Sequence, residues 1–369
     1  MTAMKEHGKL TERQFAGIIA NTLIGAGSLI IPRTATNIAG TGGWISLLIA
    51  GFAVIISLFI MIRLGLRFPE ETFMEYSCRI TNKWIGKTLG IIYCIYWLLA
   101  AALIIRVFSS MIKTTVLFNT PLEIIIISML IVVVYFIRHD IQVIGRINEL
   151  YFIFIIIPII LGVFLAVREI NVIRLMPFTG GQGIGPIFAG SIDTFFSLLG
   201  FEVIILLLPS LVTQKLAYNY GTKGIVSPLA VYMVFVIIAV GLFGVEELQN
   251  LTWPTLEVIK ATPFPGLLLE RLEAVFIAFW VVAIFTSAGN ILYSSILGFT
   301  QIFELHEHRT LSFPFLPLVF FIAIYPENIY KVFDFTDLIS RLGGFLILVV
   351  PITLYLIAII RDIKGDARR

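Results

Sequence analysis

The stretch TLIGAGSLIIPR, residues 22 to 33, constrains the fold more than any other part of the chain. It lies inside an apolar run long enough to cross a membrane, yet Gly25, Gly27 and Ser28 occupy its centre and Pro32 follows. Glycine costs about 1 kcal/mol in a helix interior and proline about 3 kcal/mol. Because backbone groups cannot stay unpaired in hydrocarbon, such a break is tolerated only where protein covers it or where it lines a cavity. The stretch therefore predicts a discontinuous helix whose second half presents N–H groups and a positive dipole end, which suit a carboxylate.

The composition places this break in a membrane protein. Hydrophobic residues make up 59% of the chain and charged residues 13%, with a mean hydropathy of +0.99, whereas soluble domains carry about 25% charged residues. The apolar runs are continuous rather than alternating, which indicates an all-α integral membrane protein and not a barrel. A capping box at Thr11 and Gln14 is predicted to start the first helix, with no cleavable signal peptide before it. Cys78 and Cys94 give no disulfide framework, and the net charge of +3 is too small to indicate a nucleic-acid partner.

Apolar runs of about 20 residues predict membrane spans. We expect ten, near residues 12–37, 44–66, 87–116, 122–138, 147–167, 187–210, 224–244, 271–301, 311–325 and 339–360. The third and eighth are long enough to be strongly tilted. With ten spans, both termini and the loops after even-numbered spans share one side, and that side collects most of the lysines and arginines. Since cytoplasmic loops are rich in these residues, both termini are expected in the cytoplasm.

A second interrupted helix is predicted in span six. Its centre, residues 197–202, holds Gly200 and the acidic Glu202. Spans one to five and spans six to ten form two matching sets. Each set begins with an interrupted helix and has a long third span. This pattern is typical of two inverted five-helix repeats, here about 12–167 and 187–360, forming a single transmembrane domain with the substrate site at the paired breaks. The alternative is plain close packing of helices at small residues.

The segments IGAGSLIIPR (residues 24–33) and FFSLLGFE (residues 195–202) resemble the amino acid–polyamine–organocation transporter superfamily. The whole chain, with its opening LTERQFAGIIANTLIGAGSLIIPR, is similar to the B subunit of the spore nutrient germinant receptors. The resemblance implies a leucine-transporter-like fold with helices 1 and 6 broken. It also implies a subunit of the inner spore membrane that acts with an A subunit and a lipoprotein C subunit. That subunit would bind a small nutrient, often an amino acid, to trigger germination.

The resemblance also implies which residues bind the ligand. On span one they are Gly25, Ala26, Gly27 and Ser28, mainly through backbone N–H groups; the Ser28 hydroxyl either adds a contact or bonds back to its own helix. On span six they are Ser197, Leu198, Leu199 and Gly200, with Phe201 closing the pocket or packing. Spans three and eight flank the broken pair and contribute Tyr93, Trp97, Ala101, Thr286, Ser287 and Asn290, for which helix packing is the alternative role.

Charged residues within spans are functional hypotheses by default. Glu202 accepts a ligand ammonium group, pairs with a basic group or stays protonated, and Arg106 is a candidate partner for Asp193. Span five has no lysine, although some proton-coupled members of the superfamily carry one facing the span-one break. This departure favours a receptor over the alternative, a secondary amino acid transporter. We expect no enzyme, because no nucleophile has a His or Cys partner at useful spacing, and no cofactor is implied. His306 and His308 lack the further ligands that a metal site needs.

Overall fold

A computed structural model describes residues 8–25, 27–181, 183–261 and 272–365. Within those ranges the regular structure is helical, apart from one isolated bridge between Leu10 and Leu211. The chain is thus the all-α protein that the continuous apolar runs predict.

The first half of the chain contains helices on both sides of the first break. They are α1 (Glu12–Ile24), α2 (Gly27–Ala39), α3 (Gly43–Leu66), α4 (Phe73–Ile80), α5 (Lys83–Thr115), α6 (Leu122–Ile137) and α7 (Ile141–Ala166). The second half contains α8 (Ile184–Ser197), α9 (Ile204–Leu207), α10 (Ala217–Phe243), α11 (Val245–Asn250), α12 (Pro254–Lys260), α13 (Leu272–Ile302), α14 (Arg309–Ser312), α15 (Phe315–Ile324) and α16 (Ile329–Ile360).

The predicted start of the first helix is confirmed. The Thr11 N–H donates to the Gln14 side chain at 3.0 Å, and the Gln14 N–H donates to the Thr11 hydroxyl at 3.3 Å. This reciprocal pair satisfies donors that the first turn would otherwise leave open.

Several helices are long and apolar enough to cross a bilayer. Five continuous helical segments of the described chain meet that test, and a sixth is the bent pair Ile184–Ser197 and Phe201–Ser210. Two further apolar segments, Leu122–Ile137 and Arg309–Ile324, are shorter. Helices occupy all ten predicted ranges, while the count of ten spans remains a prediction.

The last helix begins earlier than the sequence predicted. It starts at Ile329 rather than near residue 339, because the Asn328 side chain caps it by accepting the Lys331 N–H at 3.0 Å. The first charged residues of the helix lie along its surface, where Arg341 and Asp337 approach to 3.5 Å. Opposite charges four residues apart support a helix rather than end it.

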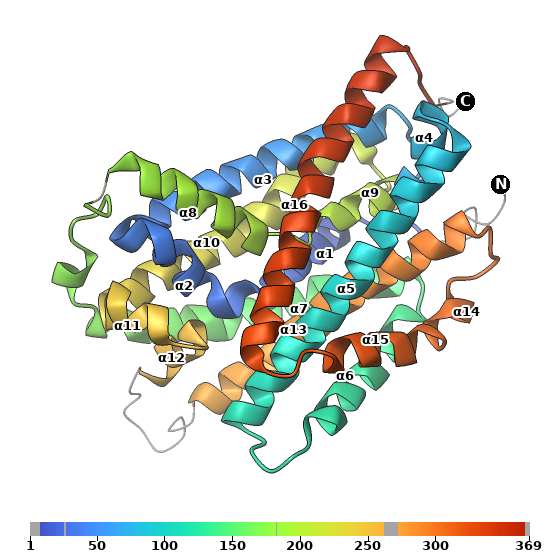
Figure 1. The fold of residues 1–369 in the computed structure, drawn as a ribbon. Coiled ribbons are helices and arrows are strands. Elements are labelled where there is room, and N and C mark those ends of the chain that lie inside the picture. The colour runs from blue at the N-terminus through green and yellow to red at the C-terminus, as the bar shows by residue number, and fades with distance from the viewer. Residues whose placement is uncertain (1–7, 26, 182, 262–271, 366–369) are drawn as a thin grey trace.

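Segments predicted to share one side of the membrane contact one another. The Leu10 N–H donates to the Ser210 carbonyl at 2.8 Å, and the Gly365 N–H donates to the Arg67 carbonyl at 2.9 Å. The described ends of the chain accordingly lie at the same end of the helix bundle (Figure 1). Arg309 pairs with Asp140 at 2.9 Å, and this ion pair joins the segments after α13 and α6, which are also predicted to share that side.

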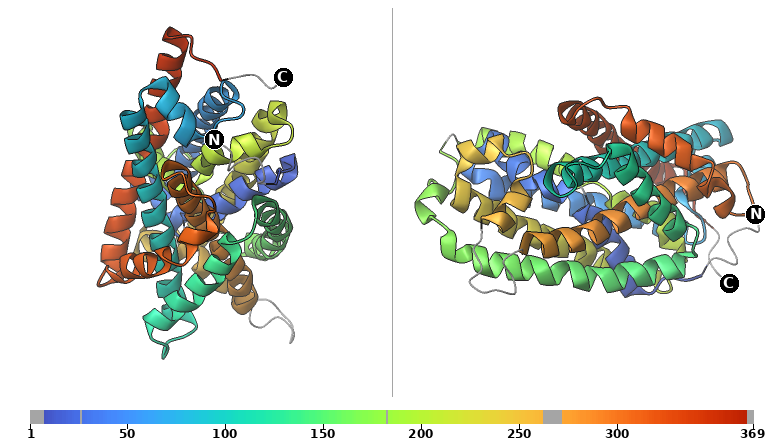
Figure 2. Two further views of the ribbon diagram at one scale, coloured as in Figure 1. Left: turned by 90° about the vertical axis from the view of Figure 1, so that its right-hand side faces the viewer. Right: turned by 90° about the horizontal axis from the view of Figure 1, so that it is seen from below.

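Long helices frame the two breaks. Helix α5 has 33 residues and packs against α13, where the Ser295 hydroxyl donates to the Cys94 carbonyl at 2.7 Å. Helix α7 runs as a continuous rod along one side of the bundle (Figure 2, right). Large apolar side chains on the outside of the bundle, such as Phe52 and Tyr135, are more than half exposed, which suits a surface that faces lipid. The interrupted helices α1–α2 and α8–α9 lie between these elements.

Candidate functional site

The carbonyl end of the first break, where α1 stops and α2 begins, is closed by hydroxyl groups. Ser287 on α13 donates to the Thr22 carbonyl at 2.9 Å, and Tyr232 on α10 donates to the Leu23 carbonyl at 2.6 Å. Ser28 on α2 reaches both the Ile24 and the Gly25 carbonyls at 2.5 Å. Carbonyls at a helix end lack partners within the helix, and here three neighbouring side chains supply them.

Ser28 therefore uses its hydroxyl inside the break. The hydroxyl bonds back to the carbonyls of Ile24 and Gly25, while a contact with a ligand stays a prediction. Its buried backbone carbonyl in turn accepts the Thr255 hydroxyl at 2.6 Å. Ala26, the remaining member of the predicted turn, lies outside the described residues.

The amide end of the first break is different. The Ser28 N–H reaches the Gly25 carbonyl only at 3.3 Å. Among hydrogen bonds between described residues, none is donated by the N–H of Gly27 or Leu29 outside helix α2. The start of α2 thus keeps backbone donors and the positive end of its dipole.

At the second break, between α8 and the 3-10 turn Phe201–Val203, an internal carboxylate bonds to a backbone amide. The chain bends by 51° there, and Gly200 adopts φ 118°, a conformation that favours glycine. The Gly200 N–H donates to Glu202 Oε2 at 2.7 Å. Tyr96 donates its hydroxyl to Glu202 Oε1 at 3.0 Å, and the Trp97 indole faces the same carboxylate.

The two breaks touch each other and α13. A Cβ added at Gly27 would lie 2.5 Å from the Ser197 carbonyl oxygen, and one added at Gly25 would lie 2.2 Å from Ser287 Oγ. One added at Gly200 would lie 3.0 Å from the Thr22 methyl group. The structure thus brings together the predicted glycines of spans one and six and the predicted serine of span eight.

The other predicted residues of α5 and α13 hold varied positions. The Tyr93 hydroxyl donates to the Leu346 carbonyl on α16 at 2.7 Å, which fastens α5 to α16. Among the described residues, Thr286 bonds only to the Val282 and Ala283 carbonyls of its own helix, each at 3.0 Å. Trp97 and Ala101 are fully buried on the face of α5 that also carries Tyr93.

The predicted residues of α8 lie at the end of that helix. The Ser197 hydroxyl bonds weakly within it, to the Asp193 carbonyl at 3.4 Å. Leu198 and Phe201 are buried, and Leu199 is partly buried.

Sequence reasoning missed a buried amide network beneath the first break. Asn148 on α7 and Asn290 on α13 exchange side-chain hydrogen bonds at 2.9 Å. Asn21 on α1 donates to the side chain of Asn148 at 3.0 Å, and Asn290 also donates to the Thr22 hydroxyl at 3.0 Å. All three asparagines are buried. Two asparagines in the apolar runs IANTLI and RINELYF were a visible signal, whereas nothing in the sequence pointed to Tyr232 or Thr255.

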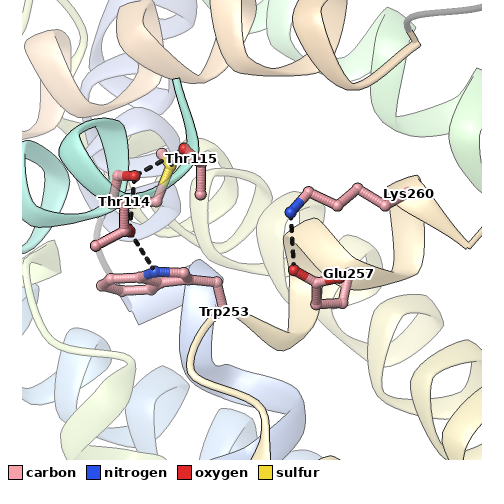
Figure 3. A network of polar contacts seen from close by, with 6 residues as sticks. Thr114, Thr115, Trp253, Glu257 and Lys260 are labelled. Carbon is pink, nitrogen blue, oxygen red and sulfur yellow. Dashed lines mark hydrogen bonds and ion pairs between the residues drawn. The ribbon is translucent and has the colours of Figure 1, made fainter. Parts of the chain in front are cut away.

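The short helix α12 packs next to the first break. Most residues of helix α12 are buried, and it packs against α2. Trp253 donates its indole N–H to the Thr114 hydroxyl at 3.3 Å, which joins α12 to the end of α5 (Figure 3). Lys260 and Glu257 pair along its surface at 3.0 Å.

The candidate pairing of Arg106 with Asp193 is wrong. The Arg106 guanidinium donates instead to the Pro326 carbonyl at 2.7 Å. Helix α5 presents this side chain to the α15–α16 connection, while Asp193 lies on α8. Within the described residues no cluster of three His, Cys, Asp or Glu side chains could hold a metal ion.

Two facing helix breaks inside an all-α membrane bundle define a transporter-like protein. A solved structure described as MhsT in complex with L-phenylalanine has this fold, with a TM-score of 0.63 at 14% identity over 90% of this chain and 87% of that one. The family model for "Spore germination protein" matches residues 9–332, and the chain belongs to that family. Spore germination protein YndE of Bacillus subtilis is 31% identical, over 95% of this chain and 96% of that protein. Spore germination protein A2 of the same organism is 28% identical, over 96% and 97%.

Proposed function

We propose that this protein is the nutrient-sensing subunit of a spore germinant receptor. It binds a small nutrient, an amino acid, between the two breaks and so triggers germination. It works with an A and a C subunit in the inner membrane of the spore, with both termini in the cytoplasm. Its ten spans form two inverted repeats, about 12–167 and 187–360. The proposed ligand-binding residues are Gly25, Ala26, Gly27, Ser28, Tyr93, Trp97, Ala101, Ser197, Leu198, Leu199, Gly200, Phe201, Glu202, Thr286, Ser287 and Asn290.

The observation that supports the proposal most strongly is the asymmetry of the first break. Its carbonyls already have hydroxyl donors from Ser287, Tyr232 and Ser28, so they do not need a ligand. At the start of α2, the N–H groups of Gly27 and Leu29 have no partner outside their own helix among the described residues, and that of Ser28 reaches the Gly25 carbonyl only at 3.3 Å. A helix start with open N–H groups and a positive dipole favours an anion, and a nutrient carboxylate supplies one.

A second candidate function is secondary amino acid transport, which the fold shared with MhsT favours. The amide network argues against it. Alternating access moves one helix bundle against another around a fixed site. Here buried side-chain hydrogen bonds fasten α1 to both α7 and α13 through Asn148 and Asn290, and each such contact adds about 0.6 kcal/mol in a membrane.

Binding and uptake measurements test the two functions together. Purified protein is screened against the common amino acids for ligand-dependent thermal stabilisation, and the same preparation in proteoliposomes is tested for uptake of each labelled ligand. A sensing subunit is stabilised by particular amino acids and accumulates none of them. Uptake that depends on an ion gradient would establish the transporter instead, and a protein that no amino acid stabilises would overturn the proposed function.

A further inference from the structure

Glu202 is a carboxylate in the interior of the bundle without a cationic partner. Its side chain is fully buried. None of the ion pairs between described residues includes it. Buried charges in membrane proteins are expensive and are normally paired, so a buried carboxyl either stays protonated or binds a cation, and a cationic group that reaches it gains a counter-charge.

Three hydrogen-bond donors face the carboxylate. The Gly200 N–H and the Tyr96 hydroxyl donate to its two oxygens at 2.7 and 3.0 Å. The Trp97 indole N–H faces it without forming a hydrogen bond of standard geometry. An ionised carboxylate accepts about four hydrogen bonds, so its oxygens retain capacity for a further donor.

The region where the two breaks meet therefore has two poles. The start of α2 offers N–H groups at one end, and Gly27 brings it against the Ser197 carbonyl at the end of α8. Glu202 follows five residues later, next to Gly200, which itself contacts Thr22 of α1. A zwitterion carries the two charges that this arrangement complements.

We infer that Glu202 binds the ammonium group of the ligand and restricts the site to free α-amino acids. This inference rests on the proposed function. An α-hydroxy acid presents the same carboxylate to α2 but leaves Glu202 without its counter-charge. Losing one member of a buried charge pair costs roughly 2–5 kcal/mol, which corresponds to about 30-fold or more in affinity.

The experiment compares isosteric pairs on purified full-length protein. L-alanine with L-lactate, and L-valine with L-2-hydroxyisovalerate, are titrated into wild type and Glu202→Gln. Wild type prefers the amino acid by at least about 30-fold, and the preference falls below about 5-fold in Glu202→Gln. Equal losses for both members of a pair, with the preference retained, would show that Glu202 only caps Gly200 and would overturn the inference.

Three variants make this outcome specific. Tyr96→Phe removes a hydrogen bond to Glu202 but keeps its charge, so the preference persists. Glu257→Gln neutralises a glutamate on the surface of α12 and leaves both affinities unchanged. If Glu202→Gln does not fold, Glu202→Asp moves the charge onto a shorter side chain and lowers the affinity for the amino acid more than that for the hydroxy acid; an equal loss for both members of each pair would contradict the inference.

The salt composition separates a ligand ammonium from an inorganic cation. The titrations are repeated with sodium, potassium and N-methylglucamine as the sole cation, and the preference is the same in all three. A preference that appears with one alkali cation alone would assign that cation to Glu202 and overturn the inference. Absence of any amino acid binding to wild type is a distinct result, which contradicts the proposed function itself.

Discussion

The two breaks solve the same backbone problem in opposite ways. At the first, side-chain hydroxyls satisfy the carbonyls that α1 leaves open, and the N–H groups that start α2 keep their capacity. At the second, the amide that matters, Gly200 N–H, is already held by the carboxylate of Glu202. An interrupted helix is thus no binding site in itself. What it binds depends on whether its free carbonyls or its free N–H groups lack hydrogen-bond partners within the protein.

The two glycines of the first break also differ in how rigid their contacts are. Gly27 faces backbone, the Ser197 carbonyl, whereas Gly25 faces the tip of a side chain, Ser287. A backbone carbonyl can move away only if its helix moves, whereas a side chain can change rotamer or be substituted by a smaller one. Substitutions that meet backbone should therefore have larger effects than those that meet a side chain.

The largest effect is expected for Gly27→Ala. Its Cβ would lie 2.5 Å from the Ser197 carbonyl oxygen, so α2 and α8 must separate, at a cost of about 1–3 kcal/mol or more. Ligand-dependent stabilisation of the purified protein should be abolished. Gly185→Ala, where a Cβ meets nothing within 4 Å, is the matched control and should behave as wild type. Normal ligand binding by Gly27→Ala would mean that the breaks need not touch.

Gly25→Ala should weaken binding less, by about five- to 150-fold, the equivalent of 1–3 kcal/mol. The added Cβ would lie 2.2 Å from Ser287 Oγ and 2.9 Å from its Cβ. Ser287→Gly removes both atoms, so the double variant Gly25→Ala/Ser287→Gly should recover part of the affinity. A double-mutant cycle of dose–response curves, with immunoblots for abundance, measures the coupling. Strictly additive losses would rule out the Gly25–Ser287 contact as the cause.

Asn148→Leu should lower stability without changing ligand preference. It removes side-chain acceptors from Asn21 and Asn290 and leaves the buried Oδ1 of Asn290 without its donor, which costs about 1–3 kcal/mol. The thermal midpoint of purified protein should fall, while the rank order of amino acids stays that of wild type. A changed rank order would place the amide network inside the ligand site and would contradict a purely structural role for Asn148.

The smallest effect on affinity is expected for Ser28→Ala. Its hydroxyl serves the Ile24 and Gly25 carbonyls, so its loss should shift ligand affinity less than about threefold, since such a contact contributes roughly 0.6 kcal/mol in a membrane. Titration of the same amino acids measures the shift. A loss of tenfold or more would assign the Ser28 hydroxyl to the ligand.

Much of this architecture was predictable because glycine and charge placement follow physical rules. The breaks at Gly25 and Gly200 and the long helices α5 and α13 follow from apolar runs and helix breakers. The start of α16 was not predictable by the same rule, because Asp337 and Arg341 satisfy each other along a helix that hydropathy alone would begin later.

The partners within the site were harder to predict. The sequence around Tyr232 or Thr255 does not predict that its hydroxyl donates a hydrogen bond to a carbonyl more than 200 residues away. The Asn148 contacts likewise depend on how α1, α7 and α13 pack. The sequence predicts where backbone N–H and C=O groups lack partners within a helix. The tertiary fold determines which of these groups then accept or donate a hydrogen bond to a distant side chain.

The proposed function depends above all on the start of α2 holding the carboxylate of the ligand. A titration series tests this by comparing each amino acid that stabilises the purified protein with its carboxamide, which keeps the ammonium group and the side chain but has no negative charge. We expect the carboxamide to bind at least about tenfold more weakly, the equivalent of 1.4 kcal/mol, and Glu202→Gln to leave this difference in place. Equal affinity of the amino acid and its carboxamide for wild-type protein would show that α2 does not bind the carboxylate.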